Sequence, residues 1–182
     1  MPRTPAIAAR PARLRDGTPV LLRGQGPHDR ALLAQLFAGL SGRSRYMRFM
    51  AGMPPALPSG MLDALSAVDD VSHVGVLALR GDRPIGAARY VRSALSPEEA
   101  DVAFTVADAY HRRGLAGLMT RELLEHAASR GIARLTFEML GENRAAAALA
   151  RSLGATVRFA GGQLVATLPV APPAAGAEPL AA

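Results

Sequence analysis

The stretch Ala107-Asp108-Ala109-Tyr110-His111-Arg112-Arg113-Gly114-Leu115-Ala116-Gly117 joins a predicted strand to a predicted helix through small residues. Residues 101–106 alternate and contain Val, Phe and Thr, which is typical of a half-buried strand. Beyond the stretch, apolar residues recur at helical spacing until Gly131 ends the pattern; they are Leu115, Leu118, Met119, Leu123 and Ala127. The sequence therefore predicts a strand, a turn and a helix N-terminus in direct succession.

A helix that begins at this turn can bind a diphosphate. Its first N–H groups are free, and the positive end of the helix dipole attracts phosphate. Gly114 and Ala116 keep bulky side chains away, while Arg112 and Arg113 add positive charge. Three or four charge-assisted contacts of roughly 1.5–3 kcal/mol each are enough to hold a diphosphate. A tight turn with solvated arginines is the alternative.

Two other nucleotide-binding motifs fit the stretch poorly. The dinucleotide fingerprint places its first glycine almost directly after the strand and an acidic residue about 20 positions later. Here the turn is longer, and residues 134–140 show no such early acid. A Walker loop needs a lysine, and all 21 basic residues of the chain are arginine.

The residues 111–116, His-Arg-Arg-Gly-Leu-Ala, resemble the signature of the GNAT family of acyl-CoA-dependent N-acetyltransferases. That signature is Gln or Arg, two residues, Gly, one residue, then Gly or Ala, so His111 departs from it at the first position. Residues 143–154 resemble the second CoA element of the family, in which an Asn opens a helix that ends at Leu-Gly. The usual Tyr of this element falls at Ala150. Another group or solvent must then protonate the departing thiolate.

Within the family, three further segments look like the acetyltransferase domain of bacterial Pat-type protein-lysine acetyltransferases. They are residues 14–23, 40–49 and 100–110, and the whole resemblance covers roughly residues 13–168. Pat-type enzymes modify a lysine of acyl-CoA synthetases. The resemblance therefore implies acetyl-CoA as cosubstrate and a primary amine, foremost a protein lysine, as acceptor.

The resemblance also implies the GNAT fold, an α/β fold in which a mixed central sheet with two splayed central strands is flanked by helices. Residues 101–106 and 134–140 would be the splayed strands, with the pantetheine of CoA between them. The implied CoA-binding residues are Thr105, Val106, Ala107, Arg112, Arg113, Gly114, Leu115, Ala116, Gly117 and Asn143. Asn143 can also cap its helix, and the two roles are compatible.

Asp101 is the candidate general base, because Pat-type enzymes carry a Glu at the matching position before Val-Ala-Phe. A base is needed since a lysine amine is almost wholly charged at pH 7, and a half-buried strand is expected to raise the pKa of this carboxyl. Glu138 is the second candidate if its side chain faces the same side. For both, an exposed strand residue is the alternative. His73 is expected at the surface, and His111 beside the phosphate turn rather than in catalysis.

Composition is consistent with one domain over residues 13–170 between loose Ala- and Pro-rich ends at 1–12 and 171–182. The absence of cysteine excludes disulfides and thiolate catalysis, and four scattered histidines predict no metal site. Neither a signal peptide nor a membrane segment is legible, so a cytoplasmic location is expected. The net charge of +6 suits CoA phosphates, while 4% aromatic residues argue against nucleic acid.

Further strands are predicted at residues 19–23, 73–80, 85–91, 156–159 and 163–168, and further helices at 27–40, 44–49, 59–66 and from Asn143. The helical segment 44–49 is a candidate wall of the acceptor site or simply an amphipathic core helix. Three functions remain open: a protein-lysine acetyltransferase, an acetyltransferase of small amines, and a non-catalytic acyl-CoA-binding regulatory module.

Overall fold

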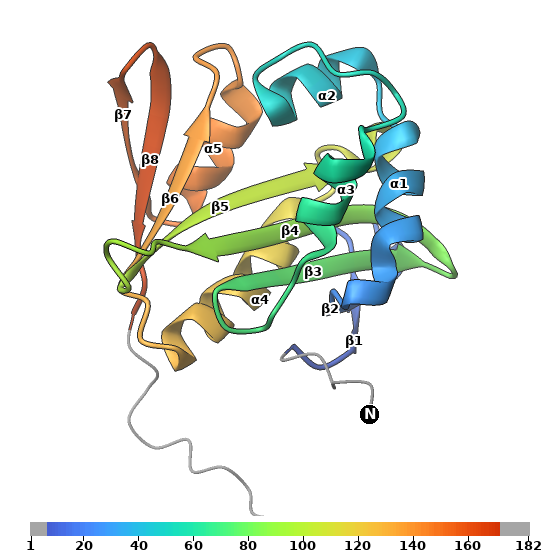
Figure 1. Ribbon diagram of the computed structural model, residues 1–182, viewed down its shortest axis with the longest axis horizontal. Coiled ribbons are helices and arrows are strands. Elements are labelled where there is room, and N and C mark those ends of the chain that lie inside the picture. The colour runs from blue at the N-terminus through green and yellow to red at the C-terminus, as the bar shows by residue number, and fades with distance from the viewer. Residues whose placement is uncertain (1–6, 172–182) are drawn as a thin grey trace, which may run out of the picture.

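The computed structural model describes residues 7–171, in which eight strands form one sheet of order β1-β2-β3-β4-β5-β6-β8-β7 (Figure 1). The strands are β1 (Arg10–Arg13), β2 (Pro19–Gly24), β3 (His73–Arg80), β4 (Arg83–Arg92), β5 (Glu99–Val106), β6 (Arg134–Met139), β7 (Thr156–Ala160) and β8 (Gln163–Pro169). The helices are α1 (Arg30–Ala38), α2 (Gly42–Phe49), α3 (Ser59–Ser66), α4 (Leu115–Ser129) and α5 (Arg144–Ser152), with short 3-10 turns η1 (Pro27–Asp29) and η2 (Asp108–Tyr110). Among these strands only β5 and β6 pair in parallel, so the predicted mixed α/β sheet is confirmed.

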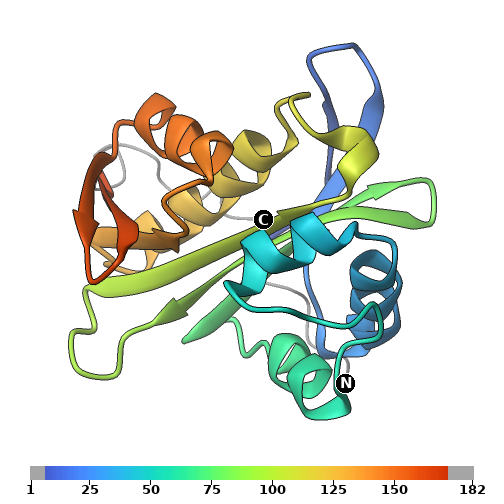
Figure 2. The ribbon, with the colours of Figure 1, turned by 90° about the horizontal axis from the view of Figure 1, so that it is seen from above.

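The helices cover the two faces of the sheet in two groups. Figure 2 shows α1, α2 and α3 on one face and α4 and α5 on the other. Successive side chains along each strand point to opposite faces of the sheet, so that a hydrophobic core forms on each face. On β4, for example, Ala88 and Tyr90 pack in the core under α4 and α5, whereas Ala87 packs in the core under α1 and α3.

The N-terminal boundary differs from the sequence prediction. Residues 10–12 were expected in a loose segment, but Arg10–Arg13 pair antiparallel with β2, and Ile7 packs into the core. The strand lies at the edge of the sheet, where Pro11 loses no ladder bond that a central strand would need. Residues 1–6 and 172–182 of the two expected loose ends lie outside the described residues.

The other predicted elements are found with small shifts. The predicted helix 27–40 is divided into η1 and α1, and β4 begins at Arg83 because the turn before it contains only Gly81 and Asp82. Gly81 adopts a φ of +57°, a conformation that glycine takes without steric cost. None of the helices in residues 7–171 is long and apolar enough to span a membrane.

Candidate active site

β5 and β6 separate after three residue pairs. They pair at Glu99–Arg134, Ala100–Leu135 and Asp101–Thr136, and beyond that point β5 pairs only with β4 and β6 only with β8. Figure 1 shows the two strands diverging from the end where β5 begins. The predicted splay of the two central strands is therefore confirmed. It leaves residues 102–106 with one unpaired backbone edge.

The unpaired edge of β5 carries backbone groups that an extended ligand can use. The N–H of Ala107 donates to the Ile85 carbonyl at 2.9 Å, and alternation in an antiparallel pair then turns the N–H and C=O of Val106 away from β4. The Val106 carbonyl accepts a hydrogen bond from His111 Nε2 at 2.9 Å. The side chain of Thr105 points to the α1 face, where its Oγ1 is buried without a hydrogen-bond partner.

The turn after β5 presents a row of free amides at the start of α4. Gly114 caps this helix with a φ of +87°, and Arg112 also has a left-handed φ of +60°. Within residues 7–171, no acceptor is bonded to any N–H from Arg112 to Gly117. A left-handed φ at an arginine costs about 1–3 kcal/mol, and such strain is often kept at binding sites. We call residues 112–117 the amide cradle, and its geometry is suited to a diphosphate.

The turn between β1 and β2 packs against the amide cradle. The N–H of Arg15 donates to the Arg113 carbonyl at 3.0 Å, and the Arg113 guanidinium pairs with Asp16 at 2.9 Å. Hydrogen bonds from Thr18 and the Arg113 charge hold the pKa of Asp16 below its usual range. Arg113, predicted to add charge at the mouth of the turn, is thus already paired, whereas Arg15 brings a cation that the local motif did not reveal.

The two candidate bases lie on the same face of the sheet. Asp101 is the last residue of β5 that pairs with β6, opposite Thr136. On β6 the buried residues Leu135, Phe137 and Met139 alternate with Thr136 and Glu138, so Glu138 projects to the face of Asp101. Asp101 is exposed, as in the alternative that the sequence left open for it. Neither carboxylate has an ion pair or hydrogen bond within the described residues.

Asn143 opens α5 as its N-cap. Its Oδ1 accepts a hydrogen bond from the N–H of Ala146 at 3.1 Å. The helix packs beside the start of α4, since a methyl group on Gly117 would lie 3.6 Å from Leu149 Cδ1. Asn143 therefore fulfils the expected capping role. Ala150 is buried in the core and supplies no hydroxyl.

α2 is tied to the segment after β5 by a residue that the sequence did not single out. Asp108 accepts hydrogen bonds from the N–H and Oγ of Ser41, at 3.0 and 2.6 Å, and from Ser44 Oγ at 2.8 Å. These bonds lower the pKa of Asp108 although partial burial opposes the shift. They hold α2 over β5, which supports its interpretation as a wall of the acceptor side.

The two remaining histidines of interest have structural partners. His73 Nδ1 lies 2.9 Å from the Ala67 carbonyl, and burial lowers the pKa of this ring. His111 lies beside the amide cradle, as expected. The described residues contain no cluster of three His, Asp or Glu that could hold a metal ion.

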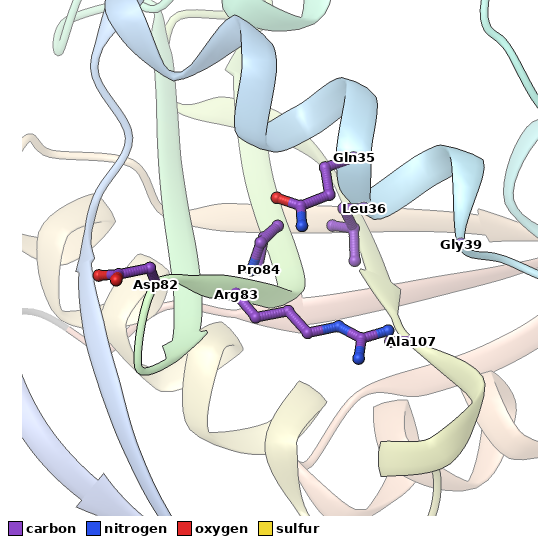
Figure 3. A pocket seen from close by; sticks show the side chains of 7 residues that line it. All are labelled: Gln35, Leu36, Gly39, Asp82, Arg83, Pro84 and Ala107. Atoms are coloured by element: carbon purple, nitrogen blue, oxygen red, sulfur yellow. The ribbon is translucent and has the colours of Figure 1, made fainter.

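Figure 3 shows a cavity of about 340 Å³ that no residue of β5 or β6 lines. It lies between α1 and the turn that opens β4, and it reaches the site only at Ala107. Its lining residues are Gln35, Leu36, Gly39, Asp82, Arg83, Pro84 and Ala107. The unpaired edge of β5 and the amide cradle lie outside this cavity.

Comparisons with known proteins agree with this geometry. A family model of the acetyltransferase (GNAT) domain matches residues 20–156. An acetyltransferase of Pseudomonas aeruginosa is 30% identical over 145 residues, which are 78% of this chain and 77% of that protein. The acetyltransferase Pat of Mycolicibacterium smegmatis is 31% identical over 147 residues, 80% of this chain but only 44% of that protein.

A solved structure has the same arrangement over nearly the full length. The GNAT domain of PAT from S. lividans is 29% identical and superposes with a TM-score of 0.85. The match covers 92% of this chain and 99% of the solved domain.

Proposed function

This chain belongs to the GNAT acetyltransferase family and is related to Pat, and from that premise we propose that it transfers an acetyl group from acetyl-CoA to a protein lysine. The family uses acyl-CoA as donor. The observation that carries the proposal is the combination of a splayed β5 edge with the amide cradle at its end. The Pat-type segments of the sequence support lysine as the acceptor.

The free groups of this chain suit the two ends of the donor. The amides of residues 112–117 would bind the diphosphate, with Arg15 and Arg112 adding positive charge. The unpaired edge of residues 102–106 would bind the pantetheine amides as a strand binds a neighbour. The Val106 carbonyl already accepts a hydrogen bond from His111 Nε2. A pantetheine amide must therefore either displace His111 or share this carbonyl with it.

The proposed chemistry is direct transfer without a covalent enzyme intermediate. Asp101, at the point where β5 and β6 separate, takes a proton from the lysine ammonium, directly or through water. The neutral amine then attacks the thioester carbonyl, so that the C–N bond forms and the C–S bond breaks, and the nitrogen releases its second proton to solvent. The leaving thiolate takes its proton from solvent because Ala150 has no hydroxyl. Glu138 is the alternative proton acceptor on the same face.

Mass spectrometry of acceptors after incubation with acetyl-CoA tests this function. An acyl-CoA synthetase, lysine peptides and small primary amines serve as acceptors, and boiled protein controls for chemical acetylation. We expect a gain of one acetyl group on lysine. If only the small amines are acetylated, a small amine and not a protein lysine is the acceptor. Binding of acetyl-CoA with no transfer to any amine would instead indicate a regulatory acyl-CoA-binding module, which the missing Tyr and the short carboxylate of Asp101 permit.

A further inference from the structure

Two arginines meet on the acceptor face of the sheet without an acidic partner. Arg89 projects from β4 toward the α1–α3 face, because its neighbours Ala88 and Tyr90 point to the opposite core. Arg48 reaches the same cavity from α2, and its guanidinium stacks over Phe49 at 5.1 Å. Both side chains are partly buried. We call Arg48 and Arg89 the arginine pair.

The environment of the arginine pair disfavours two positive charges. Burial and, to a smaller extent, the neighbouring charge of Arg89 lower the pKa of Arg48 to about 10. Burial also lowers the pKa of Arg89. The cavity that both residues line contains the buried Thr105 Oγ1, which has no hydrogen-bond partner. Positive charge and an unused hydroxyl group therefore face one small space.

Within residues 7–171, no carboxylate forms an ion pair with Arg48 or Arg89, and neither guanidinium forms a hydrogen bond. Other arginines of the chain do have such partners; they pair as Arg10 with Glu122, Arg23 with Asp29, Arg30 with Asp63, Arg113 with Asp16 and Arg134 with Glu99. Withdrawing unpaired charges from water is unfavourable. An anion bound between Arg48 and Arg89 would remove that penalty.

The position of the pair identifies which anion would bind there. Val91 pairs with Asp101 across the sheet, and Arg89 lies two residues earlier on β4, beside Ala103. Arg89 and Asp101 are thus diagonal neighbours, with α-carbons about 7–8 Å apart on such a ladder. The amide cradle lies beyond Val106, at the other end of β5. An anion at the arginine pair would accordingly belong to the acceptor and not to the phosphates of CoA.

We propose that Arg48 and Arg89 bind a carboxylate of the acceptor, so that the protein selects lysines that have an acidic side chain close by. This inference rests on the proposed function. A free amino acid also combines a primary amine with a nearby carboxylate, and it is therefore tested separately. The lysine ammonium lies near Asp101 while its acidic neighbour pairs with the two guanidinium groups.

Acetylation of matched acceptors tests the selection. Blocked peptides carry one lysine flanked by Glu or by Gln, and β-alanine is compared with β-alaninamide. We expect the wild-type kcat/KM to be at least about tenfold higher for the Glu peptide, the value of one charge-assisted contact. Arg89→Gln and Arg48→Gln should abolish the preference, so that the kcat/KM for the Glu peptide equals that for the Gln peptide in the same variant. Arg43→Gln, an exposed arginine on the same helix, should retain it.

A binding measurement separates the failure of this inference from the failure of the proposed function. Sodium glutarate, used as a dicarboxylate probe in the absence of acetyl-CoA, should raise the Tm of wild type and Arg43→Gln but not of Arg89→Gln. If glutarate raises the Tm of wild type but not of Arg89→Gln, and no amine is acetylated, the anion site is supported and the proposed transfer to lysine is wrong. If transfer occurs with equal kcat/KM for both peptides, the inference is overturned. A higher kcat/KM for β-alanine than for β-alaninamide, with equal kcat/KM for the two peptides, would show that the site binds a free amino acid. That result would overturn the proposed selection of lysines beside an acidic residue.

Discussion

The side chain of Arg15 lies against the α-carbon of Gly114, so that a methyl group at Gly114 would come within 3.3 Å of both Cγ and Nε of Arg15. This contact joins the β1–β2 turn to the amide cradle, two parts of the chain that are distant in sequence. It makes position 114 sensitive to any side chain for two independent reasons, the left-handed φ of +87° and the close approach of Arg15.

Gly114→Ala should weaken both folding and CoA binding. The left-handed backbone costs an alanine about 1–2 kcal/mol, and displacement of the cradle should lower CoA affinity about tenfold or more. Urea unfolding and calorimetric titration with CoA measure the two effects. Gly131→Ala is the matched control, because Gly131 has a φ of +71° in open space at the far end of α4. Gly131→Ala should lose a similar amount of stability and keep its CoA affinity. An equal loss of CoA affinity in both variants would contradict the proposal that the amide cradle binds CoA.

Asp16→Asn should tighten CoA binding. Asp16 neutralises the Arg113 guanidinium at the mouth of the amide cradle, and both groups are exposed, so the pair adds little stability. Its removal frees a cation for the diphosphate, and we expect a gain in affinity of about two- to threefold at low salt. Asp63→Asn breaks the comparably exposed pair with Arg30 away from the site and should leave CoA affinity unchanged. Weaker binding by Asp16→Asn would show that the ion pair positions the cradle instead.

Asp101→Asn should lower kcat for acetyl transfer by about 10²–10⁴, the usual contribution of a general base. The Kd for CoA should stay within error, because Asp101 lies at the opposite end of β5 from the cradle. Glu98→Gln removes an exposed carboxylate three residues earlier and serves as control. Full activity of Asp101→Asn combined with a slow Glu138→Gln variant would transfer the role of base to Glu138.

The fold should lose stability at acidic pH through the buried pair of Tyr90 and His126. The Tyr90 hydroxyl lies 2.8 Å from His126 Nδ1, and burial lowers the pKa of His126 below 6.5. As the pH falls, His126 therefore takes up a proton in the unfolded chain before it does so in the folded chain. The free energy of unfolding falls as the pH drops from 6.5 toward the pKa of His126 in the folded state. His126→Gln should flatten this part of a chemical-unfolding profile, whereas the exposed His28→Gln should not. An unchanged slope in His126→Gln would assign the acid sensitivity to other groups, such as His73.

Local patterns in the sequence were sufficient for the strand, the cradle and the helix around residues 101–131. The alternation of β5, the glycine at a left-handed position and the apolar stripe of α4 are each determined by neighbours in the sequence. The splay between β5 and β6 followed from the family resemblance, since no local pattern specifies where two strands cease to pair.

Contacts between distant segments were not predictable in this way. The packing of Arg15 on Gly114, the ion pair of Asp16 with Arg113 and the bonds from Asp108 to Ser41 depend on how the N-terminal hairpin and α2 dock. The strand β1 was missed because Pro11 and two arginines obscure its pattern, although an edge strand tolerates both.

The most direct test of the account is a crystal structure of the full chain with CoA bound. We predict the diphosphate within hydrogen-bond distance of amides in residues 112–117 and the pantetheine along the free edge of β5 between Val102 and Val106. Coenzyme bound elsewhere, for instance in the cavity beside α1, or no coenzyme at the amide cradle at saturating CoA, would contradict it.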